Sequence, residues 1–155
     1  MIITNQDEIK TCQKYMRLAA KEATKSKCAK SQRGVIIVKN GKVIGKGYNK
    51  PTIEKLCHPC IRENIKNNGQ VELCSAIHAE QMAIINSKES LKSARMYHIK
   101  VKDGEMKPSS DISCTVCSRI ILESGIKEFV LWHKEGYGLY SANEFNRLSF
   151  KYFLH

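Results

Sequence analysis

Four side chains of this sequence combine types and spacing that could bind a metal ion and move protons. His78 and Glu80 lie two residues apart at the start of one helical segment, and Cys114 and Cys117 lie at the start of another. A catalytic zinc site takes three N or S ligands from the protein and leaves a fourth position for water. One His and two Cys make such a set, and Glu80 would then carry the proton of a metal-bound water. We therefore predict a catalytic zinc on His78, Cys114 and Cys117.

Each pair taken alone has a less specific interpretation. A His and a Glu at this spacing occur together by chance, and an exposed His-Glu pair is common. A Cys-x-x-Cys pair in a reducing compartment is also typical of a redox site or of half of a structural zinc site. The conjunction is more informative, because both pairs open a helix, where the dipole favours thiolate over thiol. A strand between the two helices allows their N-termini to converge on one point.

The hydrophobic spacing predicts the elements that position these residues. Apolar side chains recur at helical intervals in four segments, and short β-branched segments alternate with them. Asn40-Gly41, between two such segments, is the strongest short-range signal for a β-hairpin. The expected helices are residues 7–24, 75–87, 113–124 and 141–153, and the expected strands are residues 34–39, 42–49, 95–101 and 127–132. The order α-β-β-α-β-α-β-α predicts a mixed sheet with helices on its faces.

Length and composition indicate one globular domain. The chain has 155 residues, of which 42% are hydrophobic and 26% charged, and such a chain can bury a core without disulfides. An odd number of cysteines, seven, argues against a closed disulfide framework. No apolar run is long enough to span a membrane, and the first ten residues lack the pattern of a secretory signal. We expect a single domain over residues 1–155, no membrane association and a cytoplasmic location.

The net charge of +11 is compatible with a nucleic acid, a membrane surface or an anionic small substrate. Lys accounts for 20 of the 26 basic residues, and these are scattered along the chain. A Lys-rich solvated surface is therefore the favoured interpretation. Arg33 and Arg62 could bind a phosphate, and a surface position serves equally well for both.

Three segments resemble the zinc-dependent cytidine deaminase superfamily, most closely its deoxycytidylate deaminase branch. They are SKCAKSQRGVIIVKNGKVIGKGYN (residues 26–49), ELCSAIHAEQMAII (residues 72–85) and SCTVCSRIILESGIKEFV (residues 113–130). The resemblance implies an α/β protein with a three-layer α/β/α cytidine-deaminase-like fold and a central mixed sheet. It also implies hydrolytic deamination at C4 of a cytosine. Residues 136–155, which are rich in aromatic side chains, form a divergent C-terminal segment.

The resemblance also implies individual roles. The His and the two Cys described above match the zinc ligands of the family, and Glu80 matches its proton shuttle. In this chemistry a zinc-activated hydroxide attacks C4, and Glu80 protonates the ring and the leaving amine. The backbone at Ala79 is expected to orient the pyrimidine. Asn49 matches the residue that bonds the sugar 3′-hydroxyl.

A second group of cysteines lies outside the catalytic set. Four sulfurs suit a closed, all-cysteine structural zinc site, and members of the deoxycytidylate branch often carry a second zinc in this region. Such a site would hold residues 50–74, a long zinc-binding insertion loop, beside the active site. His58 is an alternative ligand, and buried free thiols without a metal are the simpler alternative. The four are Cys28, Cys57, Cys60 and Cys74.

These observations favour a deaminase of a free cytosine nucleotide, converting dCMP to dUMP and ammonia, with zinc as cofactor. A deaminase acting on a base in tRNA or single-stranded nucleic acid, or on another free nucleobase or nucleoside, is the alternative. A non-enzymatic zinc-binding module is less favoured, because Glu80 is present. The resemblance further implies a homo-oligomer.

Overall fold

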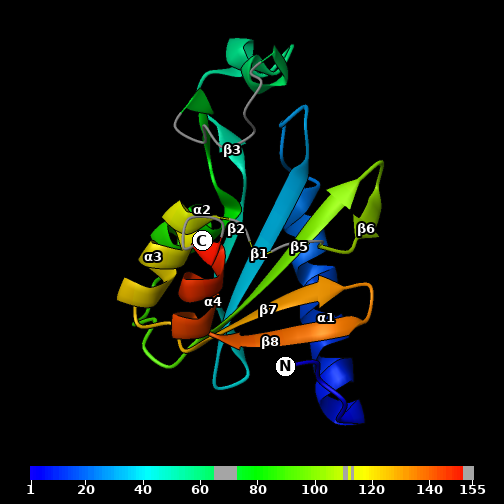
Figure 1. Ribbon diagram of the computed structural model, residues 1–155, viewed down its shortest axis with the longest axis vertical. Helices are drawn as coiled ribbons and strands as arrows, with labels where there is room; N and C mark the ends of the chain where they lie inside the picture. The colour runs from blue at the N-terminus through cyan, green and yellow to red at the C-terminus, as the bar shows by residue number, and fades with distance from the viewer. Residues whose placement is uncertain (65–72, 110–111, 113, 152–155) are drawn as a thin grey trace.

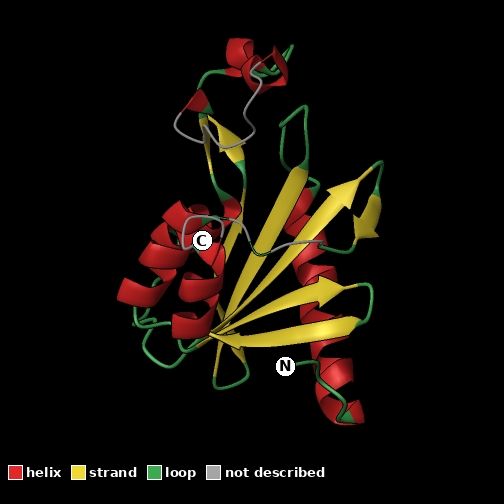
Figure 2. Ribbon diagram, viewed as in Figure 1, coloured by secondary structure: helices red, strands yellow, loops and turns green. Residues whose placement is uncertain are grey.

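The computed structural model describes residues 1–64, 73–109, 112 and 114–151. A central mixed β-sheet forms the middle of three layers, with helices on both of its faces (Figure 1, Figure 2). The strands follow the order β2-β1-β5-β7-β8, and β6 pairs with β5 beside this path. Only β5 and β7 run parallel among these pairs; the others are antiparallel. The strands are β1 (Gln32–Lys39), β2 (Lys42–Tyr48), β5 (Arg95–Lys102), β6 (Glu105–Lys107), β7 (Glu128–His133) and β8 (Gly136–Ser141).

Helix α1 (Gln6–Ala23) covers one face of the sheet, and the three later helices cover the other (Figure 1). The later helices are α2 (Ala79–Ile85), α3 (Thr115–Glu123) and α4 (Ala142–Ser149). Asn5 caps α1, since its side chain accepts a hydrogen bond of 3.0 Å from the Glu8 backbone N–H. This arrangement confirms the predicted three-layer α/β/α fold.

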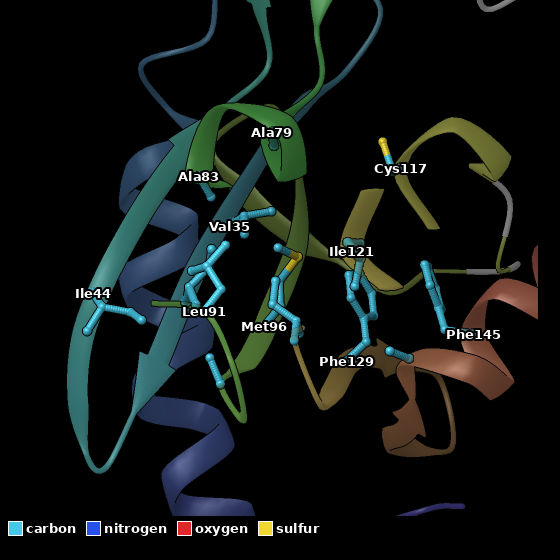
Figure 3. Close-up of a cluster of buried hydrophobic side chains, with 14 of the residues drawn as sticks. Val35, Ile44, Ala79, Ala83, Leu91, Met96, Cys117, Ile121, Phe129 and Phe145 are labelled. Atoms are coloured by element: carbon cyan, nitrogen blue, oxygen red, sulfur yellow. The ribbon is translucent and has the colours of Figure 1, made fainter. Parts of the chain in front are cut away.

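Alternation along the strands divides the core into two parts. In β1, Ile36 faces α1 while Val35 and Ile37 face the later helices. The part on the side of the later helices is the cluster of side chains that packs beneath α2, α3 and α4 (Figure 3). It includes Cys117, so one predicted zinc ligand belongs to the wall of the hydrophobic core.

The predicted hairpin is confirmed. Asn40 and Gly41 have φ values of 49° and 73°, and positive φ at both turn residues is what a tight type I′ hairpin requires. The strands on either side pair antiparallel, with Gly34 opposite Tyr48 and Lys39 opposite Lys42.

Two predicted helices are wrong at a boundary, α2 at its start and α4 at its end, and several strands were not predicted. Helix α2 begins at Ala79 rather than at residue 75, because Ala76 and Ile77 pair with Lys50–Pro51 (β3) to form β4. Asp103 and Gly104, both with positive φ, turn the chain from β5 into β6, a strand that was not predicted. Strand β8 was not predicted, and α4 ends at Ser149.

The expected insertion loop, residues 50–74, is partly structured. It contains β3, a 3-10 turn at Glu54–Leu56, a second at Ile61–Asn64, and β4 (Ala76–Ile77) follows it. This arm projects beyond the sheet (Figure 1). Residues 65–72 of the loop lie outside the described residues.

Among the described residues, no helix combines the length and the apolar character that crossing a membrane requires.

Helix α2 is seated directly on strand β2. A Cβ atom at Gly47 would meet the backbone of Ala79 and of Ala83, and one at Gly45 would meet the Ala83 carbonyl. The helix therefore lies as close to the strand as the backbones allow. The first turn of α2 holds Glu80, so glycine on β2 fixes the position of that carboxylate.

We expect Gly47→Ala to destabilise the fold by about 1–3 kcal/mol, the usual cost of inserting a methyl group into a packed interface. The free energy of unfolding in urea measures the effect. Lys46→Ala is the matched control, because Lys46 is the exposed neighbour on the same strand. Equal stability of the two variants would contradict the close seating of α2.

Candidate active site and metal centre

The first turn of α2 presents His78, Ala79 and Glu80. His78 is the N-cap residue of the helix, and its backbone N–H donates to Gln81 Oε1 at 2.9 Å. The pairing of β4 with β3 delivers the chain to this cap. Ala79 and Glu80 are buried.

The first turn of α3 presents the two cysteines. Cys114 is the N-cap residue, and its Sγ accepts a hydrogen bond of 3.3 Å from the Cys117 backbone N–H. Hydrogen bonds from the Cys117 thiol and from the His78 ring lower the pKa of Cys114 to about 5, although burial opposes the change. A thiolate at this position is the form that binds metal ions.

The structure brings the two helix starts together. His78 Nδ1 lies 3.2 Å from Cys117 Sγ and 3.3 Å from Cys114 Sγ. All three ligand atoms lie within 4.8 Å of one another, and among the described residues they form the one such group of three. Tetrahedral zinc with bonds of about 2.0–2.3 Å needs N and S ligands roughly 3.5 Å apart. The donor types and spacing therefore fit zinc.

Glu80 lies beside this cluster with 7% of its surface exposed. Its Oε2 is 3.5 Å from Cys117 Sγ, and its Oε1 is 3.5 Å from His98 Nε2. Burial raises the pKa of the carboxyl, but the imidazoles of His98 and His78 and the Arg33 guanidinium outweigh it, so the pKa is lowered overall. Glu80 is thus a buried carboxylate that is ionised at neutral pH.

His98, on strand β5, is the residue of the sheet that lies next to Glu80. Burial lowers its pKa to about 4, so the imidazole is neutral at pH 7. Its Nδ1 is the one buried side-chain N or O atom of the described residues without a hydrogen-bond partner. His98 pairs across the ladder with Val35. No motif in the sequence marks His98; its place in the alternation of β5, on the same face as Met96, is the available signal.

A cavity of about 300 Å³ opens over the cluster. Its polar lining residues include Asn49, Glu80 and His98. Its apolar lining residues include Phe129 and Phe145, whose stacked rings have centroids 4.1 Å apart. The divergent C-terminal segment therefore contributes Phe145, from α4, to the cavity.

Asn49 lies in the cavity wall with both side-chain groups engaged. Its Oδ1 accepts from the Arg33 backbone N–H at 2.8 Å, and its Nδ2 donates to the Ser31 carbonyl at 2.8 Å. Asn49 therefore holds the start of β1. One Oδ1 lone pair and one Nδ2 hydrogen remain for a ligand.

The second group of cysteines lies next to the cavity, and three of its members line the cavity: Cys28, Cys60 and Cys74. Burial raises the pKa of Cys57, a hydrogen bond with Ser75 lowers it, and the other three cysteines raise it further. Cys57 is therefore within electrostatic reach of each of the other three thiols. No three of them, all within the described part of the chain, lie within 4.8 Å of one another.

The alternative ligand His58 is exposed, whereas Cys57 and Cys60 on either side of it are buried. The backbones of these two residues also pair in an isolated antiparallel β-bridge, while their thiols remain free. The segment thus turns its sulfurs inward and its imidazole outward, which favours cysteine over histidine at this place.

Comparison with known proteins identifies relatives over most of the chain. The sequence family described as cytidine and deoxycytidylate deaminase zinc-binding region matches residues 9–133. Deoxycytidylate deaminase of Mycobacterium phage D29 is 30% identical over 131 residues, covering 78% of this chain and 92% of the phage protein. Deoxycytidylate deaminase of Saccharomyces cerevisiae is 29% identical over 121 residues, covering 75% of this chain. The chain spans 35% of the length of that yeast relative.

Solved structures share the fold. The dCMP deaminase from cyanophage S-TIM5, in complex with dCMP and dUMP, has a TM-score of 0.53 at 23% identity, covering 81% of this chain and 82% of that chain. Cytidine deaminase from Burkholderia pseudomallei has a TM-score of 0.58 at 17% identity, covering 86% and 94%.

Proposed function

The chain belongs to the family of cytidine and deoxycytidylate deaminases, and from this membership we propose that it is a zinc-dependent hydrolase that converts dCMP to dUMP and ammonia. The observation that carries the proposal is the contact of a buried, ionised carboxylate with a three-ligand metal cluster. Glu80 and the cluster share one cavity of about 300 Å³, a size usual for a small-molecule site.

His78, Cys114 and Cys117 would hold the catalytic zinc. When bound in such a site, zinc lowers the pKa of water to about 7 and so supplies a nucleophile at neutral pH. The fourth position of the tetrahedron is left for this water, because the protein provides three ligands within reach.

Glu80 performs the proton transfers. Its carboxylate accepts a proton from the attacking water and delivers it to N3 of the cytosine ring. A second proton then passes through the same carboxylate to the exocyclic amine, which leaves as ammonia while the C4 carbonyl forms. The His98 ring, 3.5 Å from Oε1, supports the orientation of the carboxylate.

The walls of the cavity orient the substrate. The backbone at Ala79 borders the cavity beside Glu80 and would hold the pyrimidine edge. Phe129 and Phe145 offer an apolar surface for the ring. Asn49 retains one donor and one acceptor for the sugar 3′-hydroxyl.

The charge of the cavity supports a nucleotide. Lys30, Arg33 and Arg62 line it, and Glu80 is the one carboxylate among its described lining residues. Such a balance favours an anionic substrate. A base within a nucleic acid is the second candidate, favoured by the net charge of +11; its binding would weaken steeply with salt.

We also propose a second, structural zinc on Cys28, Cys57, Cys60 and Cys74. The support is the proximity of the four thiols and the inward orientation of Cys57 and Cys60. The ion would fasten the arm to the cavity wall. Its formation requires the four sulfurs to draw closer than they lie in this structure.

Residues 1–155 would act as one deaminase domain in a cytoplasmic homo-oligomer. All seven cysteines are free thiols, as expected in a reducing compartment. Ile85 on α2 and Ile120 on α3 are 66% and 38% exposed, and burial of these side chains would favour association through the two helices.

We expect Glu80→Gln to reduce the dCMP deamination rate by about 10²- to 10⁴-fold, because the amide cannot carry a proton. The zinc content should be unchanged, since Glu80 is not a ligand. Steady-state ammonia release and metal analysis on the same sample measure both. Glu89→Gln is the control, because that residue pairs with Lys42 on the surface. A Glu80→Gln rate equal to that of the control would refute the proton-transfer role.

Zinc stoichiometry separates the two proposed metal sites. We expect two equivalents in the wild type, one in Cys117→Ala with activity lost, and one in Cys60→Ala with the catalytic ion retained. Cys12→Ala should keep both, since Cys12 belongs to α1 and is buried in the other half of the core. A wild type with one equivalent that Cys60→Ala leaves unchanged would exclude the second site. Full zinc content in Cys117→Ala would exclude the first.

A further inference from the structure

Arg33 stands in the cavity without a counter-ion. It lies near the start of β1 and is half-buried in the cavity wall. Its Nε donates to Ser31 Oγ at 3.3 Å. Within the described residues no carboxylate forms an ion pair with its guanidinium, although the charge of Glu80 acts on it through space and opposes burial, which lowers its pKa. The two terminal nitrogens of the guanidinium are therefore available to a ligand.

A second cation lies directly across the ladder. Lys100 on β5 is the register partner of Arg33, and directly opposed side chains of an antiparallel pair share a face. Burial lowers the pKa of Lys100, and Arg33, Lys102 and Lys30 lower it further. Like charges at opposed positions repel each other. An anion bound at Arg33 would reduce the repulsion between Arg33 and Lys100, so the pairing of these two cations favours anion binding.

The backbone holds Arg33 firmly in place. Asn49 accepts from the Arg33 N–H through Oδ1, and the Asn49 N–H donates to the Arg33 carbonyl at 3.3 Å. Ser26 Oγ in turn donates to the Asn49 carbonyl at 2.6 Å. Arg33 is therefore preorganised, and binding costs little additional ordering of the main chain.

We propose that Arg33, with Lys30 beside it at the cavity wall, recognises the phosphate monoester of the substrate and thereby selects nucleotides over nucleosides. A planar guanidinium matches phosphate oxygens with two parallel hydrogen bonds. Arg33 adjoins Asn49, the proposed sugar contact, so base, sugar and phosphate would extend from Glu80 toward Arg33. This assignment rests on the proposed function for the identity of the nucleotide.

The test compares Arg33→Gln with the wild type on dCMP and deoxycytidine. We expect kcat/KM for dCMP to fall about 10- to 100-fold, the loss of one charged hydrogen-bonding group, mainly through KM. Loss of the Arg33 charge near Glu80 affects both substrates alike, so kcat/KM for deoxycytidine should fall much less than kcat/KM for dCMP. Arg33→Lys keeps the positive charge but lacks the paired donors of the guanidinium, so it should recover part of the lost kcat/KM for dCMP. Lys10→Gln removes an exposed cation of α1 and should alter neither value.

Binding without turnover separates this inference from the proposed reaction. Calorimetry should show that the wild type binds dUMP at least 10-fold more tightly than deoxyuridine, and that Arg33→Gln loses this difference. If dCMP is not deaminated but the dUMP preference depends on Arg33, the reaction is wrong and the phosphate site stands. If dCMP is deaminated and Arg33→Gln keeps the nucleotide preference, the phosphate site is overturned. A wild type without preference for dUMP overturns it as well.

Discussion

The close contact between helix α2 and strand β2 is the constraint on which the site depends. Because Gly45 and Gly47 carry no side chains, the backbone of α2 rests on the strand. That seating places His78 and Glu80 at a fixed height above the sheet. Helix α3 then needs only to bring its N-cap to the same point, and the three metal-binding atoms meet within 4.8 Å. A looser helix would separate the carboxylate from the metal centre that it serves.

The electrostatics of the site follow from burial. A carboxylate with 7% exposure would ordinarily protonate, but the groups around Glu80, the His78 ring and the Arg33 guanidinium among them, lower its pKa and keep it ionised. The neighbouring His98 is deep enough to remain neutral. The Glu80 carboxylate is therefore charged and able to accept a proton, while His98, which orients it, does not compete for that proton. The cations Lys30 and Arg33 also line the cavity, which favours an anionic substrate.

Local signals in the sequence predicted the parts of the fold that depend on local interactions. Asn40 and Gly41 adopt the positive φ values that their turn needs. The hydrophobic periodicity that predicts α1 lies entirely within that one helix. His78, Cys114 and Cys117 were predicted as a cluster because their residue types identify the chemistry without the geometry. The β3–β4 pair escaped prediction because its two strands are distant in sequence. Strand β8 pairs with the adjacent β7, but its sequence GYGLYS contains two glycines and no β-branched residue, so it gave no strand signal. Arg33 was a candidate phosphate ligand from its type alone, but its position opposite Lys100, like the position of His98 beside Glu80, follows only from the folded sheet.

The central claim is that the carboxylate and the metal cluster act together on a free cytosine nucleotide. Ammonia release by the zinc-loaded protein from dCMP, CMP, dCTP, deoxycytidine, cytosine and a cytosine-containing single strand tests it directly. The account predicts that dCMP gives the highest kcat/KM of the set. Deamination confined to the single strand, or no ammonia from any of the six, would contradict it.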